Sequence, residues 1–161
     1  MTSPSQLSSL QEDLTQLLNT PFWWRLPLGK LILRTLLVID PTIPQRFQYH
    51  KKVNYWWVQI HSSRFGEVVL CLWLPNSWSD RHDHYSSKNL TIVLLGKLVA
   101  TLYHVSGSKF YIYNKTEVGE MEITTTPAWQ IHSLANPFDE LCVSLNFYWV
   151  RRPSLFLKVE D

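Results

Sequence analysis

Cysteine is scarce in this chain of 161 residues, which contains only Cys71 and Cys142. Each lies in an apolar run of strand length, so we expect two buried thiols in a reducing compartment and no disulfide framework. A cytoplasmic protein is implied. The sequence also lacks a Cys-x-x-Cys pair, a glycine-rich phosphate loop and a Gly-x-Ser-x-Gly elbow, which excludes several common enzyme classes.

A strong net charge and a long apolar segment are also missing. The chain has 15 Lys and Arg against 13 Asp and Glu, a formal charge of +2, and its basic residues are scattered. We therefore expect no nucleic-acid partner. The start of the chain has no basic region followed by an apolar one, and no uncharged run reaches membrane-spanning length. These features predict neither export nor a membrane anchor.

What the sequence does contain is a helical pattern followed by short apolar runs. Leucines at helical spacing predict a first helix that ends near Pro21, and residues 29–38 fit either a second helix or a buried strand, of which we favour the helix. Seven apolar runs between turn signals then predict strands at 55–60, 67–73, 90–95, 98–103, 110–113, 120–124 and 141–149. The pattern indicates a β-barrel or sandwich, as one domain over residues 1–161, with a helical cap at 1–45 and the barrel at 46–161.

Three histidines form the most informative pattern in the chain. In a strand, side chains alternate between faces, so His82 and His84 of His82-Asp83-His84 should point the same way. His132 is a candidate third ligand from a distant strand. Three imidazoles can hold one first-row metal ion and leave open positions for other ligands. By the same alternation, Arg81 and Asp83 should point away, Arg81 to form an ion pair or face solvent and Asp83 to have a structural role.

The spacing of these histidines resembles the two motifs of the cupins. The first motif reads His82-x-His84, four residues, Asn89, six residues and Gly96, with Asn89 in place of the family's glutamate. The second motif is represented by Pro127, His132 and Asn136, with Trp129 in place of a glycine. This resemblance implies an all-β fold, the double-stranded β-helix or jelly-roll barrel of the cupins, with a short N-terminal helical segment.

Within the cupins, the chain resembles the cysteine dioxygenase group of thiol dioxygenases. The likeness covers roughly residues 55–153 and is carried by the segments 79–84, 95–98, 132–136 and 143–148, together with Tyr103. It implies Fe(II) held by His82, His84 and His132, with zinc or nickel able to take its place in the purified protein. The implied substrates are dioxygen and a small thiol, whose sulfur would be oxidised to a sulfinate.

Two departures from this group bear on the substrate. Its Tyr-x-Arg becomes Tyr55-Trp56-Trp57 here, and an indole cannot bind a carboxylate through two parallel hydrogen bonds as arginine does. We therefore expect a substrate other than cysteine, unless Arg34, Arg64 or Arg81 reaches in from a neighbouring loop or helix and takes the place of that arginine. Its Ser-x-His-x-Tyr becomes Ser144-x-Asn146-x-Tyr148, which keeps Tyr148 as the expected catalytic residue. The residues expected to contact the substrate are Trp57, Gln59, Asn89, Ser144 and Asn146.

Two other functions remain open at this point. One is a cupin that binds a metal or a small molecule without catalysis, because the arginine and the relay histidine of the group are replaced. The other is a metal-dependent cupin reaction on a substrate that is not a thiol. In either case we expect a monomer or a small homo-oligomer.

Overall fold

The computed structural model describes Glu12 and residues 26–149. Apart from Glu12, the predicted first helix therefore lies outside the described residues. Helix α2 (Leu28–Ile39) confirms the helix over the strand at this place, and a short helix α3 (Ile43–Arg46) follows. Within the described part of the chain, no helix is both long enough and apolar enough to cross a membrane.

Strands occupy most of the remaining described chain. In sequence order they are β1 (Gln48–His50), β2 (Tyr55–Ser63), β3 (Gly66–Trp73), β4 (Ser77–Trp78), β5 (Lys88–Leu95), β6 (Leu98–Ser106), β7 (Lys109–Val118), β8 (Ile123–Thr126), β9 (His132–Asn136) and β10 (Cys142–Trp149). Six of the seven predicted runs coincide with strands. No bounds were predicted for β1, β4 and β9, although His132 was expected on a strand. Each of the three is short and β9 is largely polar, so neither length nor alternation marks them in the sequence.

The predicted strand at 120–124 is wrong at its start. Residues before β8 form a turn, in which the Glu122 carboxylate accepts a hydrogen bond from the Gly119 N–H at 2.7 Å and Met121 has a positive φ of 62°. A side chain that bonds to nearby backbone offers the chain an alternative to the strand ladder. The strand consequently begins only at Ile123.

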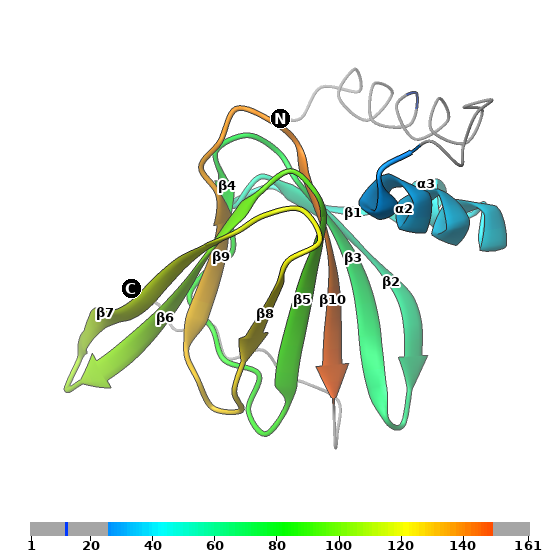
Figure 1. Cartoon of the computed structure of the whole chain (residues 1–161). Coiled ribbons are helices and arrows are strands. Elements are labelled where there is room, and N and C mark those ends of the chain that lie inside the picture. The colour runs from blue at the N-terminus through cyan, green and yellow to red at the C-terminus, as the bar shows by residue number, and fades with distance from the viewer. Residues whose placement is uncertain (1–11, 13–25, 150–161) are drawn as a thin grey trace.

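The strands form two sheets (Figure 1). The larger sheet has the order β1-β2-β3-β10-β5-β8, and the smaller sheet has the order β4-β9-β6-β7. The paired strands in both sheets are antiparallel. This architecture agrees with the expected double-stranded β-helix.

Helix α2 packs on the outer face of the larger sheet. Its buried residues Leu33 and Leu37 lie in an apolar cluster with side chains of β2, β3, β5 and β10, and Figure 1 shows both helices together on one side of the barrel. Gly29 permits this approach, since a Cβ there would lie 1.7 Å from the Leu94 carbonyl oxygen. Each large apolar side chain that is fully buried contributes roughly 1.5–3 kcal/mol to folding. We call this cluster the outer core.

The space between the two sheets has a second cluster. Its apolar members include Val93 of β5, Leu98 of β6 and Leu134 of β9, together with the two cysteines. Both cysteines are buried and are not bonded to each other, as the sequence predicted for buried thiols. Burial raises the pKa of Cys71 to about 12, which keeps that thiol protonated and unreactive. We call this cluster the inner core.

Candidate metal centre

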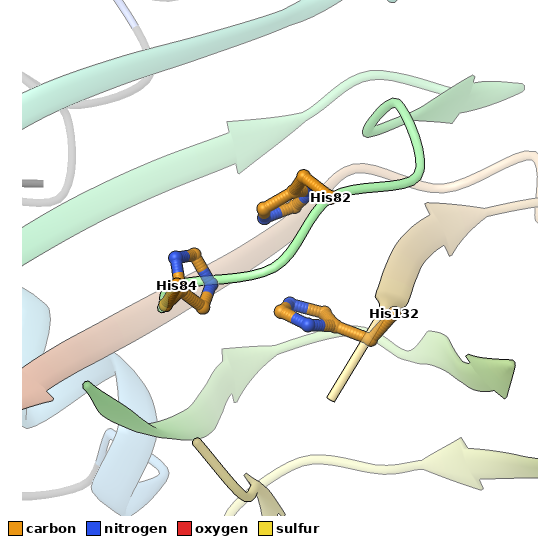
Figure 2. A group of neighbouring side chains, drawn as sticks. All are labelled: His82, His84 and His132. Carbon is orange, nitrogen blue, oxygen red and sulfur yellow. The ribbon is translucent and has the colours of Figure 1, made fainter. Parts of the chain in front are cut away.

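Three imidazoles converge at one place in the barrel (Figure 2). His82 and His84 lie in the loop between β4 and β5, and His132 is the first residue of β9. The ring centroids are 4.5–4.8 Å apart in all three pairs, and one ring nitrogen from each lies within 4.8 Å of the others. The structure therefore brings together the three histidines that the sequence singled out.

The segment His82-Asp83-His84 is not the strand that alternation assumed. Only His82 has a β-bridge, to His132, and the next two residues lie in a loop. The Asp83 carboxylate accepts a hydrogen bond from the Tyr85 N–H at 3.2 Å, and Tyr85 has a positive φ of 51°. This local turn replaces the strand, yet it still directs both imidazoles to the same side.

Backbone carbonyls orient two of the three rings. The Nδ1 atom of His82 lies 2.7 Å from the carbonyl oxygen of Asp80, and that of His132 lies 3.4 Å from the carbonyl oxygen of Gln130. A carbonyl only accepts, so each Nδ1 carries the proton and Nε2 becomes the nitrogen suited to a metal. In both cases the carbonyl belongs to the residue two positions before the histidine.

A backbone rung fixes the distance between the two ligand segments. The N–H of His82 donates to the carbonyl of His132 at 3.0 Å, and the N–H of His132 donates to the carbonyl of His82 at 2.9 Å. Both bonds use main-chain atoms only. The relative position of these two histidines is therefore set independently of their side chains.

The electrostatics of the site favour uncharged imidazoles. Burial lowers the pKa of His84 to about 3, with a further contribution from His82. Burial also lowers the pKa of His132 well below its usual value and lowers that of His82. Neutral imidazole is the form that ligates metals, so a buried donor set of this kind fits a divalent first-row ion such as iron or zinc.

The Tyr148 side chain contacts the histidine cluster from β10. Its ring lies 4.8 Å from the ring of His84 in an edge-to-face arrangement. Burial raises the pKa of Tyr148 well above its usual value, so the phenol stays protonated at neutral pH. The expectation that Tyr148 faces the three histidines agrees with this position.

The predicted contacts Asn89, Ser144 and Asn146 lie on the inward face but are engaged by other protein groups. Ser144 Oγ accepts hydrogen bonds from Trp73 Nε1 at 2.9 Å and from Asn146 Nδ2 at 3.1 Å. Asn146 Oδ1 accepts one from Thr91 Oγ1 at 2.7 Å, and Asn89 Nδ2 donates to the Phe147 carbonyl at 3.4 Å. All are buried. We call Trp73, Ser144, Asn146, Thr91 and Asn89 the polar file.

The remaining predicted contacts lie on β2. Trp57 is half-buried and packs against the inner core, whereas Gln59 is exposed, so the structure does not bring Gln59 together with the histidines. Arg81 points away from them, as expected, and its guanidinium carbon lies 4.6 Å from the ring centre of Phe110. Asp83 has the structural role described above.

Sequence reasoning missed several groups around the site. Asp80 and Gln130 act through main-chain carbonyls, which no side-chain pattern reveals. Thr91 lies in the predicted strand 90–95 and alternates inward with Val93, so its position on the inner face could be predicted from the sequence. Its hydrogen bond to Asn146 could not be predicted. The ring centres of Tyr85 and Trp129 are 5.7 Å apart. Nothing in the sequence predicted this contact, except that Trp129 takes the place of a glycine in the second cupin motif.

Solved structures share this architecture, although no protein-family model matches the chain. The TT1209 protein of Thermus thermophilus superposes with a TM-score of 0.55 at 16% identity, over 67% of this chain and 93% of that one. A protein with a double-stranded β-helix domain from Klebsiella pneumoniae subsp. pneumoniae does so with a TM-score of 0.55 at 14% identity, over 74% and 95%. The chain has a cupin fold.

A third structure with this cupin fold is an enzyme. Oxalate decarboxylase from Bacillus subtilis superposes with a TM-score of 0.54 at 14% identity, over 66% of this chain and 28% of the enzyme. The chain thus spans little more than a quarter of that enzyme, whose Mn(II) centres have been studied. At these identities the likeness establishes the cupin fold, and the chemistry must be argued from the residues.

Proposed function

We propose that this cupin is a non-haem iron(II) enzyme of the thiol dioxygenase type, which oxidises a small thiol other than cysteine. The observation that carries the proposal is the all-histidine cluster of His82, His84 and His132, with the neutral phenol of Tyr148 packed against it. Among the residues that the structure describes, no carboxylate is a member of this cluster. Three neutral ligands leave both charges of a divalent ion uncompensated, which favours an anionic thiolate as an additional ligand.

The three imidazoles would hold the iron through the nitrogen atoms that face one another. Iron(II), when bound, supplies the redox chemistry by which dioxygen adds both oxygen atoms to a thiol sulfur. The balanced reaction is RSH + O₂ → RSO₂H, so it needs no further reductant. The protein's own contribution is to hold the ligands neutral and oriented through the carbonyls of Asp80 and Gln130.

Tyr148 would supply a proton donor beside the reacting atoms. Its pKa is raised by burial, so its hydroxyl carries a proton over the whole physiological range. A neutral donor in a buried site can stabilise negative charge that develops on oxygen or sulfur. The polar file, whose members Ser144 and Asn146 lie on the same strand face, would keep the inward face of β10 in place.

The surroundings of the site argue against a free amino acid as substrate. A carboxylate taken from water needs a paired cation or several donors to offset its desolvation. Trp57 has no such charge, and the guanidinium of Arg81 lies over the ring of Phe110. We therefore assign the substrate to thiols with a neutral or aromatic body.

A metal-dependent reaction on a substrate that is not a thiol is the second candidate. It is favoured by the fold shared with Bacillus subtilis oxalate decarboxylase and by the ability of a three-histidine site to bind several first-row metals.

The deciding experiment measures oxygen consumption by the iron-loaded protein with a panel of thiols. The panel contains cysteine, 3-mercaptopropionate, 2-mercaptoethanol and benzyl mercaptan, and the product is identified by mass spectrometry. We expect uncharged thiols to consume oxygen and form one sulfinate per dioxygen, with cysteine slower by about tenfold or more, since an unpaired carboxylate costs at least ~1.4 kcal/mol.

The outcomes separate the candidates. Rapid oxidation of cysteine would contradict the specificity inferred from Trp57 and leave the dioxygenase activity intact. If no thiol is oxidised by protein that holds one iron per chain, the thiol dioxygenase proposal is wrong, which leaves binding without catalysis and the second candidate, a reaction on a substrate that is not a thiol.

A further inference from the structure

Two aromatic residues next to the metal ligands adopt an unfavourable backbone conformation. Tyr85 has a φ of 51° and Trp129 has a φ of 65°. Bulky side chains rarely adopt this left-handed region, because their Cβ crowds the backbone, and glycine or asparagine normally takes such positions. Strained residues of this kind persist where the surrounding structure fixes them, and they cluster at functional sites.

These two residues join the segments that carry the ligands. Tyr85 directly follows His84, and the Trp129 N–H donates a hydrogen bond to the Tyr85 carbonyl at 2.7 Å. The two rings meet edge to face with their centres 5.7 Å apart and their planes at 79°. Trp129 also precedes Gln130, whose carbonyl orients the ring of His132.

Burial of the indole does not offset the strain. Trp129 is 63% exposed, so most of its apolar surface faces solvent. The hydrogen bond to Tyr85 uses only the backbone N–H of Trp129, and glycine would form the same bond at this φ without strain. The fold therefore requires an N–H and a left-handed residue at this position, and it does not require an indole.

We propose that Trp129, supported by Tyr85, is a specificity-determining residue that binds the flat, apolar body of the substrate beside the metal centre. The inference rests on the proposed function for the reactive end of the molecule, a thiol that reaches the three histidines. The rest of such a molecule would extend from the histidines toward the neighbouring loops, and the rings of Tyr85 and Trp129 meet in those loops. An exposed indole offers an aromatic ligand a stacking or edge-to-face partner.

The test measures thiol binding without turnover. Protein loaded with zinc is titrated anaerobically by calorimetry with benzyl mercaptan and with 2-mercaptoethanol, which share the sulfhydryl and differ in the aromatic ring. Trp129→Gly removes the indole and relieves the strain, and Trp129→Asn removes the indole with a residue that also tolerates this conformation. Trp78→Ala is the matched control, because Trp78 is 48% exposed and lies on β4, opposite Ala135 near the far end of β9 from His132.

We expect both Trp129 variants to bind benzyl mercaptan about fivefold more weakly, the effect typical of one lost aromatic contact, and to bind 2-mercaptoethanol as the parent does. Trp78→Ala should leave both affinities unchanged, and Trp129→Gly should melt at the parent temperature or above it. Equal affinities for benzyl mercaptan in the parent and both variants overturn the proposal. An equal loss for both thiols also overturns it, because Trp129 would then act only through the metal ligands. If the iron-loaded protein oxidises no thiol while the selective loss persists, the proposed function fails and the binding role of Trp129 stands.

Discussion

The two faces of strand β10 differ in chemistry although they alternate residue by residue. Val143, Leu145 and Phe147 point outward into the outer core beneath α2. Ser144 and Asn146 point inward and bond to each other, and Tyr148 on the same face meets the ring of His84. The outer face is therefore stabilised by apolar burial, whereas the inner face carries the hydrogen-bonded pair Ser144 and Asn146 and the tyrosine whose ring contacts the candidate metal centre. Stability and chemistry can accordingly be perturbed separately from a single strand.

The largest expected effect is on metal binding. His132→Ala should reduce the bound metal from one per chain to almost none, because it removes one of three ligands. The fold should remain, since the rung to His82 uses main-chain atoms. Its counterpart in the outer core is Leu37→Ala, which should lower the free energy of unfolding by about 2–5 kcal/mol and leave the metal content unchanged. Elemental analysis and denaturant unfolding measure both quantities, and full metal content in His132→Ala would refute the three-histidine site.

The next effect is on turnover and compares neighbours on opposite faces. Tyr148→Phe should keep the metal content and lower the rate of thiol oxidation by about 100-fold, as expected for the loss of a positioned proton donor. Phe147→Leu should leave the rate unchanged and cost roughly 1 kcal/mol of stability through poorer packing in the outer core. Steady-state oxygen uptake on iron-loaded variants provides the measurement. A parent-like rate in Tyr148→Phe would remove its catalytic role.

A third effect concerns pH and the metal-free protein. The pKa of His84 is about 3 in the folded chain, and that of an imidazole in the unfolded chain is about 6.5. Between these values the unfolded chain binds more protons than the folded chain. The contribution of His84 to the free energy of unfolding should therefore be complete above pH ~6.5, and the free energy of unfolding should fall as the pH decreases toward ~3. Denaturant unfolding at a series of pH values tests this, with His84→Gln as the control that should give a shallower fall. An unchanged free energy of unfolding between pH ~6.5 and ~4 would show that the imidazoles are not buried as neutral groups.

The smallest effect is on stability, and it compares a buried serine that forms hydrogen bonds with a buried serine that forms none among the described residues. Ser144→Ala leaves the donors of Trp73 and Asn146 without their acceptor, so we expect a loss of about 1–3 kcal/mol in stability. Ser77 is the matched control, because it is equally buried and its hydroxyl has no hydrogen-bond partner among the described residues. Ser77→Ala should be neutral or slightly stabilising. Similar losses in the two variants, measured by thermal unfolding, would mean that the polar file contributes only packing.

Much of the fold was predictable because its signals are local. The inward position of Tyr148 follows from alternation along β10, and the helix at 28–39 was favoured for a run of apolar residues that also fitted a buried strand. The turn at Gly119 and the loop at His84 were not predictable, since side chains bonding to nearby backbone decide them. For the site, spacing identified the three histidines, although the assumed strand around His82 was wrong.

The predicted substrate contacts show where sequence reasoning ends. Asn89, Ser144 and Asn146 were placed on the correct face, but alternation does not reveal that their polar atoms bond to one another and to Trp73. Such bonds connect residues that are far apart in the sequence, so they depend on the register of the strands. Their role toward a substrate, like that of Trp57, stays a prediction.

The pair of backbone hydrogen bonds between His82 and His132 couples metal binding to local opening of the barrel. Its two hydrogen bonds join a loop to the first residue of β9, segments that are distant in the sequence. A metal held by side chains on both segments would act as a cross-link across this rung, and cross-links between distant segments oppose local opening of a chain. The amide protons of these two residues should then exchange with solvent at a common rate, and this rate should fall when metal binds. Backbone hydrogen exchange would therefore report metal binding by the side chains.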